Sequence, residues 1–273
     1  MKKAILFDLD ATLIQFNQKQ FEHEYFTKLL KKIEPLGINT AEFEKVLWSA
    51  VKNMYANNGE KTNEQVFWDT LNIKYSNHSS KLKETFDDYY SNEYNSIQKI
   101  VKQNQYVKQI VKYCQQNFEY VILATNPFFP HFAVASRLEW VGLSMNDFDY
   151  VTTYEIAHYS KPNPKFFEEV LDKFGLKPSD CIMVGNNEAE DYMTATSIGI
   201  ESYDEQSFLD ALEEKTIESS VIQITIDNHE VLSVGNTIIF EEKGITHFPM
   251  ISIDGGPLME FSEARKWVDA QEA

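Results

Sequence analysis

Cysteine is scarce in this chain of 273 residues, and long apolar runs are missing. Cys114 and Cys181 lie far apart, without metal-ligand spacing, so we expect buried free thiols in a reducing compartment rather than a disulfide. The apolar run after the N-terminal lysines stops at Phe7, far short of a signal-peptide core or a membrane span. These absences predict a cytoplasmic protein with no membrane partner.

Positive charge is also in short supply. The chain has 25 Lys and Arg against 42 Asp and Glu, a net charge of −17. Phosphate backbones and anionic membranes are bound by clustered cations, so nucleic acid is excluded as an expected partner. A small phosphorylated molecule stays compatible with this composition, because one or two local positive charges are enough to bind it.

The first half of the chain reads as helices. Between residue 18 and about residue 100, Phe21 and Tyr25 begin a series of apolar residues that recurs every four positions. The stretches that open at Asn39 and Thr62 carry Glu or Gln three residues on, which is the arrangement of a capping box. The aromatic residues of this block, such as Phe67 and Tyr90, are expected to form its core.

From about residue 104 the predicted helices and strands alternate, which indicates a parallel sheet covered by helices on both faces. The apolar strand at residues 4 to 10 belongs to the same sheet, so the helical block is an insertion after the first strand. We predict an α/β fold: a doubly wound, Rossmann-like parallel sheet, an all-helical cap insertion and a small α+β C-terminal appendage. The predicted domains are a core (1–14 and 104–205), a cap (15–103) and a connecting helix with the α+β domain (206–273).

The C-terminal region, residues 219 to 273, has its own pattern. Short alternating strands are predicted in "VIQITI", "HEVLSV", "NTIIF" and "PMISI", and a closing helix has Ser262 as its N-cap. A domain of about 50 residues has a marginal core on its own. We therefore expect it to dock on the main body, on a second copy of the chain or on a protein partner.

Two acids follow the first strand in "FDLDATL". Asp8 and Asp10 are two positions apart, so an extended chain places them on the same side, where they repel each other and lose hydration. A strand-end turn is the plain interpretation, because acids are favoured there. The functional interpretation is that a cation or a reaction compensates for the repulsion.

Other polar side chains follow the later strands. The carboxyl ends of parallel strands meet at one edge of a sheet, and ligands bind there. Thr125 and Asn126 end the second strand, Lys161 precedes a proline before a helix, and Asn186 and Asp191 follow the fourth strand. Each alone has a plain interpretation, such as a surface lysine or a helix N-terminus. Together they place one lysine among acids and amides.

This set suits phosphoryl transfer. Asp8 can attack phosphorus to form an aspartyl phosphate, while Asp10 protonates the leaving oxygen and later deprotonates water. Thr125, Asn126 and Lys161 can bind the phosphoryl oxygens. A hard cation held by carboxylate and amide oxygens, for which we predict Mg²⁺, would offset the repulsion between carboxylate and phosphate.

Four motifs in this order resemble the haloacid dehalogenase (HAD) superfamily of aspartate-nucleophile phosphohydrolases, over about residues 1 to 205. The resemblance implies Asp8 as nucleophile and Asp10 as acid and base, with Thr125 and Lys161 on the phosphate. It also implies that the helical insertion is a cap, which closes over the site and selects the substrate. The motifs are "FDLDATL", "ILATN", "SKPNP" and "MVGNNEAEDYMTATSIGI".

Two positions depart from the family pattern. Ala11 stands where glycine is usual, a small change that should be tolerated, and Asn186 stands where an aspartate is usual. An amide oxygen ligates Mg²⁺ without adding charge. The implied metal ligands are Asp8, Asp10 through its backbone carbonyl, Asn186 and Asp191. The acid at position 10 argues against dehalogenation, because the dehalogenase branch lacks it.

Two hypotheses follow. The leading one is a Mg²⁺-dependent phosphatase that hydrolyses a small phosphorylated metabolite, a phosphomonoester, through an aspartyl phosphate on Asp8. The alternative is a binding or regulatory module with the HAD fold, catalytically weak because of Asn186, whose C-terminal domain mediates protein interaction. No motif identifies the substrate, because specificity depends on side chains of the cap.

Overall fold

A five-stranded parallel sheet lies at the centre of the molecule, with strand order β3-β2-β1-β4-β5. The computed structural model describes residues 2–102, 107–204 and Phe208, and the backbone of three strands in the C-terminal region. The strands are β1 (Ala4–Phe7), β2 (Tyr120–Leu123), β3 (Tyr150–Val151), β4 (Cys181–Val184) and β5 (Glu201–Tyr203). The predicted doubly wound parallel sheet is confirmed.

The three central strands end at the same level. Phe7 of β1 pairs with Leu123 of β2 on one side and with Val184 of β4 on the other. All four residues of β1 are buried, which agrees with an apolar strand covered on both faces. The loops that follow these strands therefore begin side by side.

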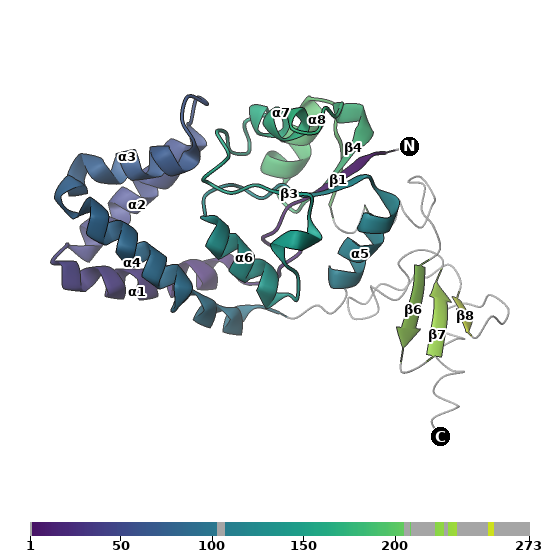
Figure 1. The fold of residues 1–273 in the computed structure, drawn as a ribbon, viewed down its shortest axis with the longest axis horizontal. Coiled ribbons are helices and arrows are strands. Elements are labelled where there is room, and N and C mark those ends of the chain that lie inside the picture. Colours follow the sequence, from purple (N-terminus) through teal and green to yellow (C-terminus); the bar gives the residue numbers. More distant parts are fainter. Residues whose placement is uncertain are drawn as a thin grey trace, which may run out of the picture.

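Helices cover the two faces of the sheet (Figure 1). Ile5 and Phe7 face α5 and α6, and the alternate residues Ala4 and Leu6 face α7 and α8, in two separate apolar clusters. The helix bounds are α5 (Val107–Asn117), α6 (His131–Trp140), α7 (Lys165–Asp172) and α8 (Thr194–Ser197). A π-helix (Glu188–Met193) precedes α8.

The first strand is shorter than predicted. It ends at Phe7 rather than at residue 10, although the amide of Asp8 still donates to the carbonyl of Val184 over 2.9 Å. The chain then turns, and Ala11 has φ 61, in the left-handed region. This turn ends the strand early, directly after the buried carboxylate of Asp8. The strand β3 is also short, with only two residues.

The helical block between β1 and β2 lies beside the sheet (Figure 1). The predicted N-caps are confirmed: Asn39 accepts from the amide of Glu42, and Thr62 and Gln65 form a reciprocal capping box. The helices are α1 (Gln18–Ile33), α2 (Thr40–Tyr55), α3 (Asn63–Tyr75) and α4 (Ser79–Ser91), with a 3₁₀-helix (Tyr94–Ile100) after them.

The segments that enter and leave this block run side by side. Gln15 and Lys102 form an antiparallel bridge, in which the amide of Lys102 donates to the carbonyl of Gln15 over 2.8 Å. One continuous apolar cluster runs from the sheet into the helical block. The domain boundaries given above stay predictions.

The C-terminal strands form a separate antiparallel sheet in the order β6-β7-β8. Their bounds are β6 (Ile222–Ile226), β7 (His229–Ser233) and β8 (Ile251–Ile253), which match three of the four predicted strands. The strand predicted in "NTIIF", the connecting helix and the helix capped by Ser262 lie outside the described residues.

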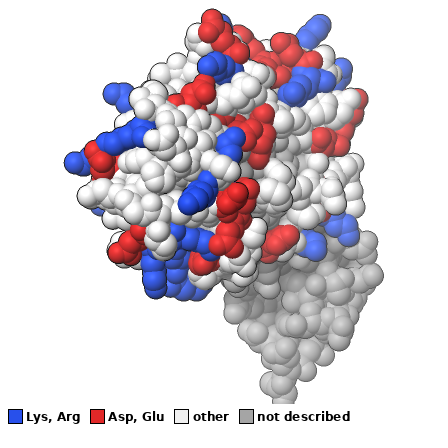
Figure 2. All heavy atoms as spheres, turned by 60° about the vertical axis from the view of Figure 1, so that its left-hand side comes forward, with Lys and Arg blue, Asp and Glu red and all other residues white. Residues whose placement is uncertain are grey.

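Acidic and basic side chains lie interspersed on the face drawn in Figure 2. Both cysteines are free and buried, as predicted. Within the described ranges, every helix is too short or too polar to cross a bilayer. The cytoplasmic location stays a prediction.

Candidate active site

A fully buried lysine lies between two carboxylates at the carboxyl edge of the sheet. Nζ of Lys161 donates to Oδ1 of Asp8 over 2.8 Å and to Oδ1 of Asp191 over 2.5 Å. Lys161 is 0% exposed, and both acids are buried. Asp8 follows β1, Lys161 precedes α7, and Asp191 belongs to the π-helix after β4. The structure thus brings together three of the predicted site residues from three loops.

Burial and charge act in opposite directions in this cluster. Burial raises the pKa of the Asp8 carboxyl to about 7, with Lys161 lowering it and Asp191 adding to the rise. Burial opposes the charge of Lys161, but the two carboxylates outweigh it and hold the pKa of the ammonium above its ordinary value. When both acids are ionised, the cluster has one negative charge more than the lysine neutralises.

Asp191 is held in place by the backbone of its own loop. Its Oδ2 accepts from the amide of Asn187 over 3.0 Å. Gly185 permits the close approach, because a Cβ at that position would lie 2.4 Å from Cγ of Asp191. The glycine of the fourth motif is therefore required by the packing of the acid that follows it.

Asn126 holds the backbone on which Lys161 stands. Its Oδ1 accepts from the amide of Lys161 over 2.9 Å, and its Nδ2 donates to the Lys161 carbonyl over 3.3 Å. Nδ2 also donates to Oε2 of Glu190 over 2.9 Å. Thr125, beside it, is buried, and its carbonyl accepts from the hydroxyl of Thr152. In this structure, Asn126 positions the lysine. A direct contact of Asn126 with phosphate stays a prediction.

Asp10 turns away from this cluster toward Arg137 of α6. Nη1 of Arg137 donates to Oδ2 of Asp10 over 2.6 Å, and the guanidinium lies 4.4 Å from the centre of the Phe129 ring. Burial opposes the charge of Arg137, but the carboxylate of Asp10 outweighs it and raises the pKa of the guanidinium above the ordinary value. Sequence reasoning missed Arg137, whose one signal was a basic residue within the largely apolar stretch "FAVASRLEW".

Asn186 faces the loop that carries the two acids. The hydroxyl of Thr12 donates to its Oδ1 over 3.4 Å. Within the described part of the chain, no three His, Cys, Asp or Glu side chains gather in a way that could hold a metal. A cation here would depend on the predicted mixed set: the carboxylates of Asp8 and Asp191, the amide oxygen of Asn186 and the backbone carbonyl of Asp10.

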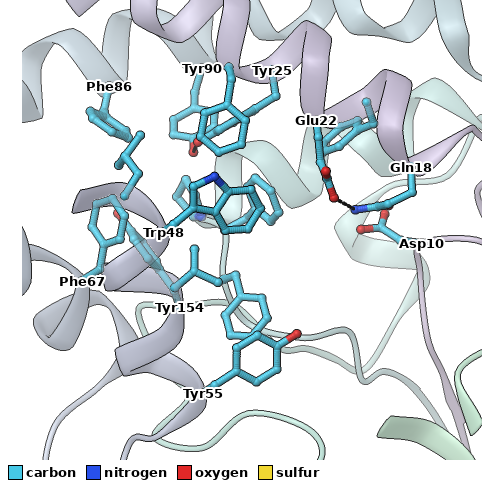
Figure 3. Close-up of a pocket in the computed structure, with 17 residues that line it drawn as sticks. Asp10, Gln18, Glu22, Tyr25, Trp48, Tyr55, Phe67, Phe86, Tyr90 and Tyr154 are labelled. Carbon is cyan, nitrogen blue, oxygen red and sulfur yellow. Dashed lines mark hydrogen bonds between the residues drawn. The ribbon is translucent and has the colours of Figure 1, made fainter. Parts of the chain in front are cut away.

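A cavity of about 230 Å³ opens next to Asp10 (Figure 3). Its wall combines aromatic side chains of the helical block, such as Trp48, with Phe128 and Phe129 from the loop after β2. The prediction that the aromatics of the insertion form its core is confirmed for Phe67 and Tyr90, which also line this cavity. Both are 7% exposed, because they pack within the apolar cluster of the helical block as well as against the cavity.

Comparison with known proteins identifies the family. A family model described as haloacid dehalogenase-like hydrolase matches residues 2–199. A second model, of a domain of unknown function (DUF5052), matches residues 185–250. Because the first match covers most of the chain, the chain belongs to the haloacid dehalogenase-like hydrolase family. The resemblance inferred from the four motifs is confirmed.

Individual relatives match over different lengths. A stretch of 79 residues is 35% identical to the glyceraldehyde 3-phosphate phosphatase of Methanothermobacter thermautotrophicus, covering 29% of this chain and 35% of that protein. Thus the chain spans about a third of that relative. Pyrophosphatase PpaX of Bacillus cereus is 22% identical over 194 residues, covering 67% of this chain and 74% of PpaX.

One solved structure shows the same fold at low sequence identity. The 2-haloacid dehalogenase from Pseudomonas syringae pv. Tomato DC3000 has a TM-score of 0.51 and 19% identity, covering 74% of this chain and 85% of that chain. This likeness concerns the fold alone, and it agrees with the predicted α/β class.

Proposed function

We propose that this chain is a Mg²⁺-dependent phosphohydrolase that cleaves a small phosphomonoester through an aspartyl phosphate on Asp8. The observation that carries the proposal is the buried ammonium of Lys161, bonded to Asp8 and Asp191 at the carboxyl edge of the sheet. Family membership and the names of two relatives, a phosphatase and a pyrophosphatase, support it.

The reaction divides into two displacements. An oxygen of the Asp8 carboxylate attacks phosphorus, the bond from phosphorus to the leaving oxygen breaks, and Asp10 supplies that oxygen with a proton. Water then attacks the aspartyl phosphate, Asp10 takes a proton from the water, and the bond between phosphorus and Asp8 breaks. Inorganic phosphate and free Asp8 result.

Lys161 and Thr125 act on the phosphoryl oxygens. Because Lys161 is excluded from solvent, its charge acts with little screening on negative charge that develops nearby. Its bond to Asp8 keeps one carboxylate oxygen oriented, which leaves the other for attack. Asn126 holds the backbone of Lys161 in the position from which the ammonium reaches Asp8.

The residues present fit a hard divalent cation. Asp8 and Asp191 offer anionic oxygens, while Asn186 and the backbone of Asp10 offer neutral ones, and Mg²⁺ prefers an all-oxygen set. The oxygens of Asp191 already accept hydrogen bonds, but each has a second lone pair. When bound, the cation would offset the repulsion between the Asp8 carboxylate and the phosphate.

The test is hydrolysis of a generic chromogenic phosphomonoester with Mg²⁺, with chelator, and with the Asp8→Asn variant. We expect turnover that requires Mg²⁺ and disappears in the variant. Acid quench during turnover, followed by mass spectrometry of the peptide that contains Asp8, should find it phosphorylated. Wild-type rates in Asp8→Asn would refute the mechanism.

The alternative, a weakly catalytic binding module, is favoured by one observation: Asn186 is neutral at a position where the family usually has an acid. That function predicts phosphate binding without turnover, and turnover that appears only in Asn186→Asp. The same assay on this variant separates the two functions.

A further inference from the structure

The cavity beside Asp10 has an unusual wall. Eleven of its 17 lining residues are aromatic (Figure 3). They come from both the helical block and the loops of the sheet, so the cavity lies where the two parts meet. Asp10, the proposed acid and base, lies at one end of it, beside Gln18 and Glu22. A leaving group whose oxygen is protonated by Asp10 would extend into this aromatic space.

The rings are arranged to receive another ring. Trp48 and Tyr55 line the cavity with 45% and 40% of their surface still exposed, although both are large and mostly apolar. The ring centres of Tyr55 and Phe128 lie 4.5 Å apart, and those of Phe26 and Trp48 lie 5.2 Å apart. Both pairs are tilted. Exposed ring faces that already pack on neighbours gain further contact from a flat ligand.

The charges at the wall are of one sign. Asp10 and Glu22 are the charged residues among those that line the cavity, and the described lining contains no lysine, arginine or histidine. Arg137 lies behind Phe129 and already pairs with Asp10. Because Arg137 already pairs with Asp10, a leaving group with its own carboxylate or phosphate would meet the charge of Glu22 and no free cation in the described lining.

We infer that the leaving group of the substrate is an uncharged alcohol that carries a flat aromatic or heteroaromatic ring. This inference rests on the proposed function, because it names the substrate class of the same site. It separates this chain from a pyrophosphatase, whose leaving group is anionic. The ring would lie among Trp48, Tyr25 and Phe128, with the ester oxygen toward Asp10.

Three matched esters test the inference: benzyl phosphate, para-carboxybenzyl phosphate and cyclohexylmethyl phosphate. All release a primary alcohol, so their chemical reactivity is similar. We expect kcat/KM for benzyl phosphate to exceed that for the carboxylated ester by about 10-fold, from repulsion by Glu22. It should exceed that for the cyclohexyl ester by about 3-fold, from ring packing. Equal or reversed orders would overturn the inference.

Two variants tie the preference to the cavity. Trp48→Ala should lower kcat/KM for benzyl phosphate by about 3- to 10-fold and leave methyl phosphate almost unaffected. Glu22→Lys should raise the ratio of kcat/KM for para-carboxybenzyl phosphate to kcat/KM for benzyl phosphate by about 10-fold. Phe132→Ala is the matched control, because that ring is 56% exposed and lies outside the cavity. A ratio unchanged in Glu22→Lys would contradict the assignment.

Binding measurements keep the inference testable without turnover. Benzylphosphonate and para-carboxybenzylphosphonate cannot be hydrolysed, and their affinities can be measured by calorimetry. Tighter binding of the uncharged ring, lost in Trp48→Ala, supports the inference even if no ester is cleaved, in which case the proposed function fails alone. Hydrolysis of all three esters at the same kcat/KM, with equal phosphonate affinities, would uphold the function and refute the inference.

Discussion

The guanidinium of Arg137 donates to the carboxylate of Asp10 over 2.6 Å across 127 positions of sequence. Asp8, two residues before Asp10, has a different buried cation, Lys161. The two acids that follow the first strand are therefore each paired with a cation of the protein. A bound metal would come in addition to these pairs. Because the two pairs differ in geometry, we expect opposite effects on the free energy of unfolding when Asp8 and Asp10 are replaced.

Asp8→Asn should abolish turnover without weakening the fold. Asp8 and Asp191 face the same ammonium, so removing one carboxylate leaves Lys161 and Asp191 as a balanced pair. We expect the free energy of unfolding to stay equal or to rise by about 1 kcal/mol. Urea unfolding in the presence of a metal chelator measures it. A loss of stability would mean that Asp8 is the main partner of the lysine.

Asp10→Asn should weaken the fold as well as the reaction. The substitution leaves the buried guanidinium of Arg137 without its anion. Because the Asp10 side chain is 33% exposed, solvent weakens the pair, and we expect the free energy of unfolding to fall by about 2 kcal/mol. The rate should fall roughly 10²–10⁴-fold. The control is the double variant Asp10→Asn with Arg137→Met, which should recover part of the stability in a double-mutant cycle. Additive losses would rule out the coupling.

Asn63 should be important for docking of the helical block. It begins α3 and is fully buried; its Nδ2 donates to the hydroxyl of Ser160 over 3.0 Å and to the carbonyl of Pro127 over 3.3 Å. Asn63→Leu removes both bonds and leaves the Pro127 carbonyl without this donor, so we expect the free energy of unfolding in urea to fall by about 2–3 kcal/mol and kcat/KM to be lower. Asn53→Leu, at an exposed hydrogen bond on α2, should change stability by less than about 0.5 kcal/mol.

Asn186→Asp should tighten Mg²⁺ binding. An anionic oxygen at this proposed ligand increases the attraction for the cation, whereas Asp191→Asn should weaken the binding. Calorimetric titration with Mg²⁺ measures both changes, and we expect about a 10-fold shift in each direction. Asn187→Asp is the matched control, because its side chain caps the following helix through Ala189 and Glu190. An equal gain in the control would show a general charge effect instead.

Ala11→Gly should stabilise the loop between the two acids. Among the described residues, Ala11 is the one non-glycine with a positive φ, at 61°. An L-residue in that region costs about 1–2 kcal/mol. The greater freedom of glycine in the unfolded chain offsets part of this cost, so we expect the free energy of unfolding to rise by about 0.5–1 kcal/mol in Ala11→Gly. Thermal or urea unfolding measures the change. Ala56→Gly, at an exposed helix end with φ −91, should instead lose stability.

The sequence by itself determined the order of strands and helices and the set of polar residues at the strand ends. Alternation of apolar strands and amphipathic helices dictates a parallel sheet, and a parallel sheet brings the ends of its strands to one edge. For that reason Asp8, Lys161 and Asp191 could be expected to meet before their distances were known. Local capping patterns at Asn39 and Thr62 were equally readable, because a cap involves only neighbouring residues.

Only the tertiary structure decided which side chains meet across the insertion. Arg137 and Asn63 carry no motif, and their partners lie far away in sequence. Apolar periodicity shows that a side chain such as Phe67 is buried, but it cannot show that the ring also lines a cavity. That depends on how the helical block docks against the loops of the sheet, which is determined by long-range packing and by buried hydrogen bonds rather than by any local pattern.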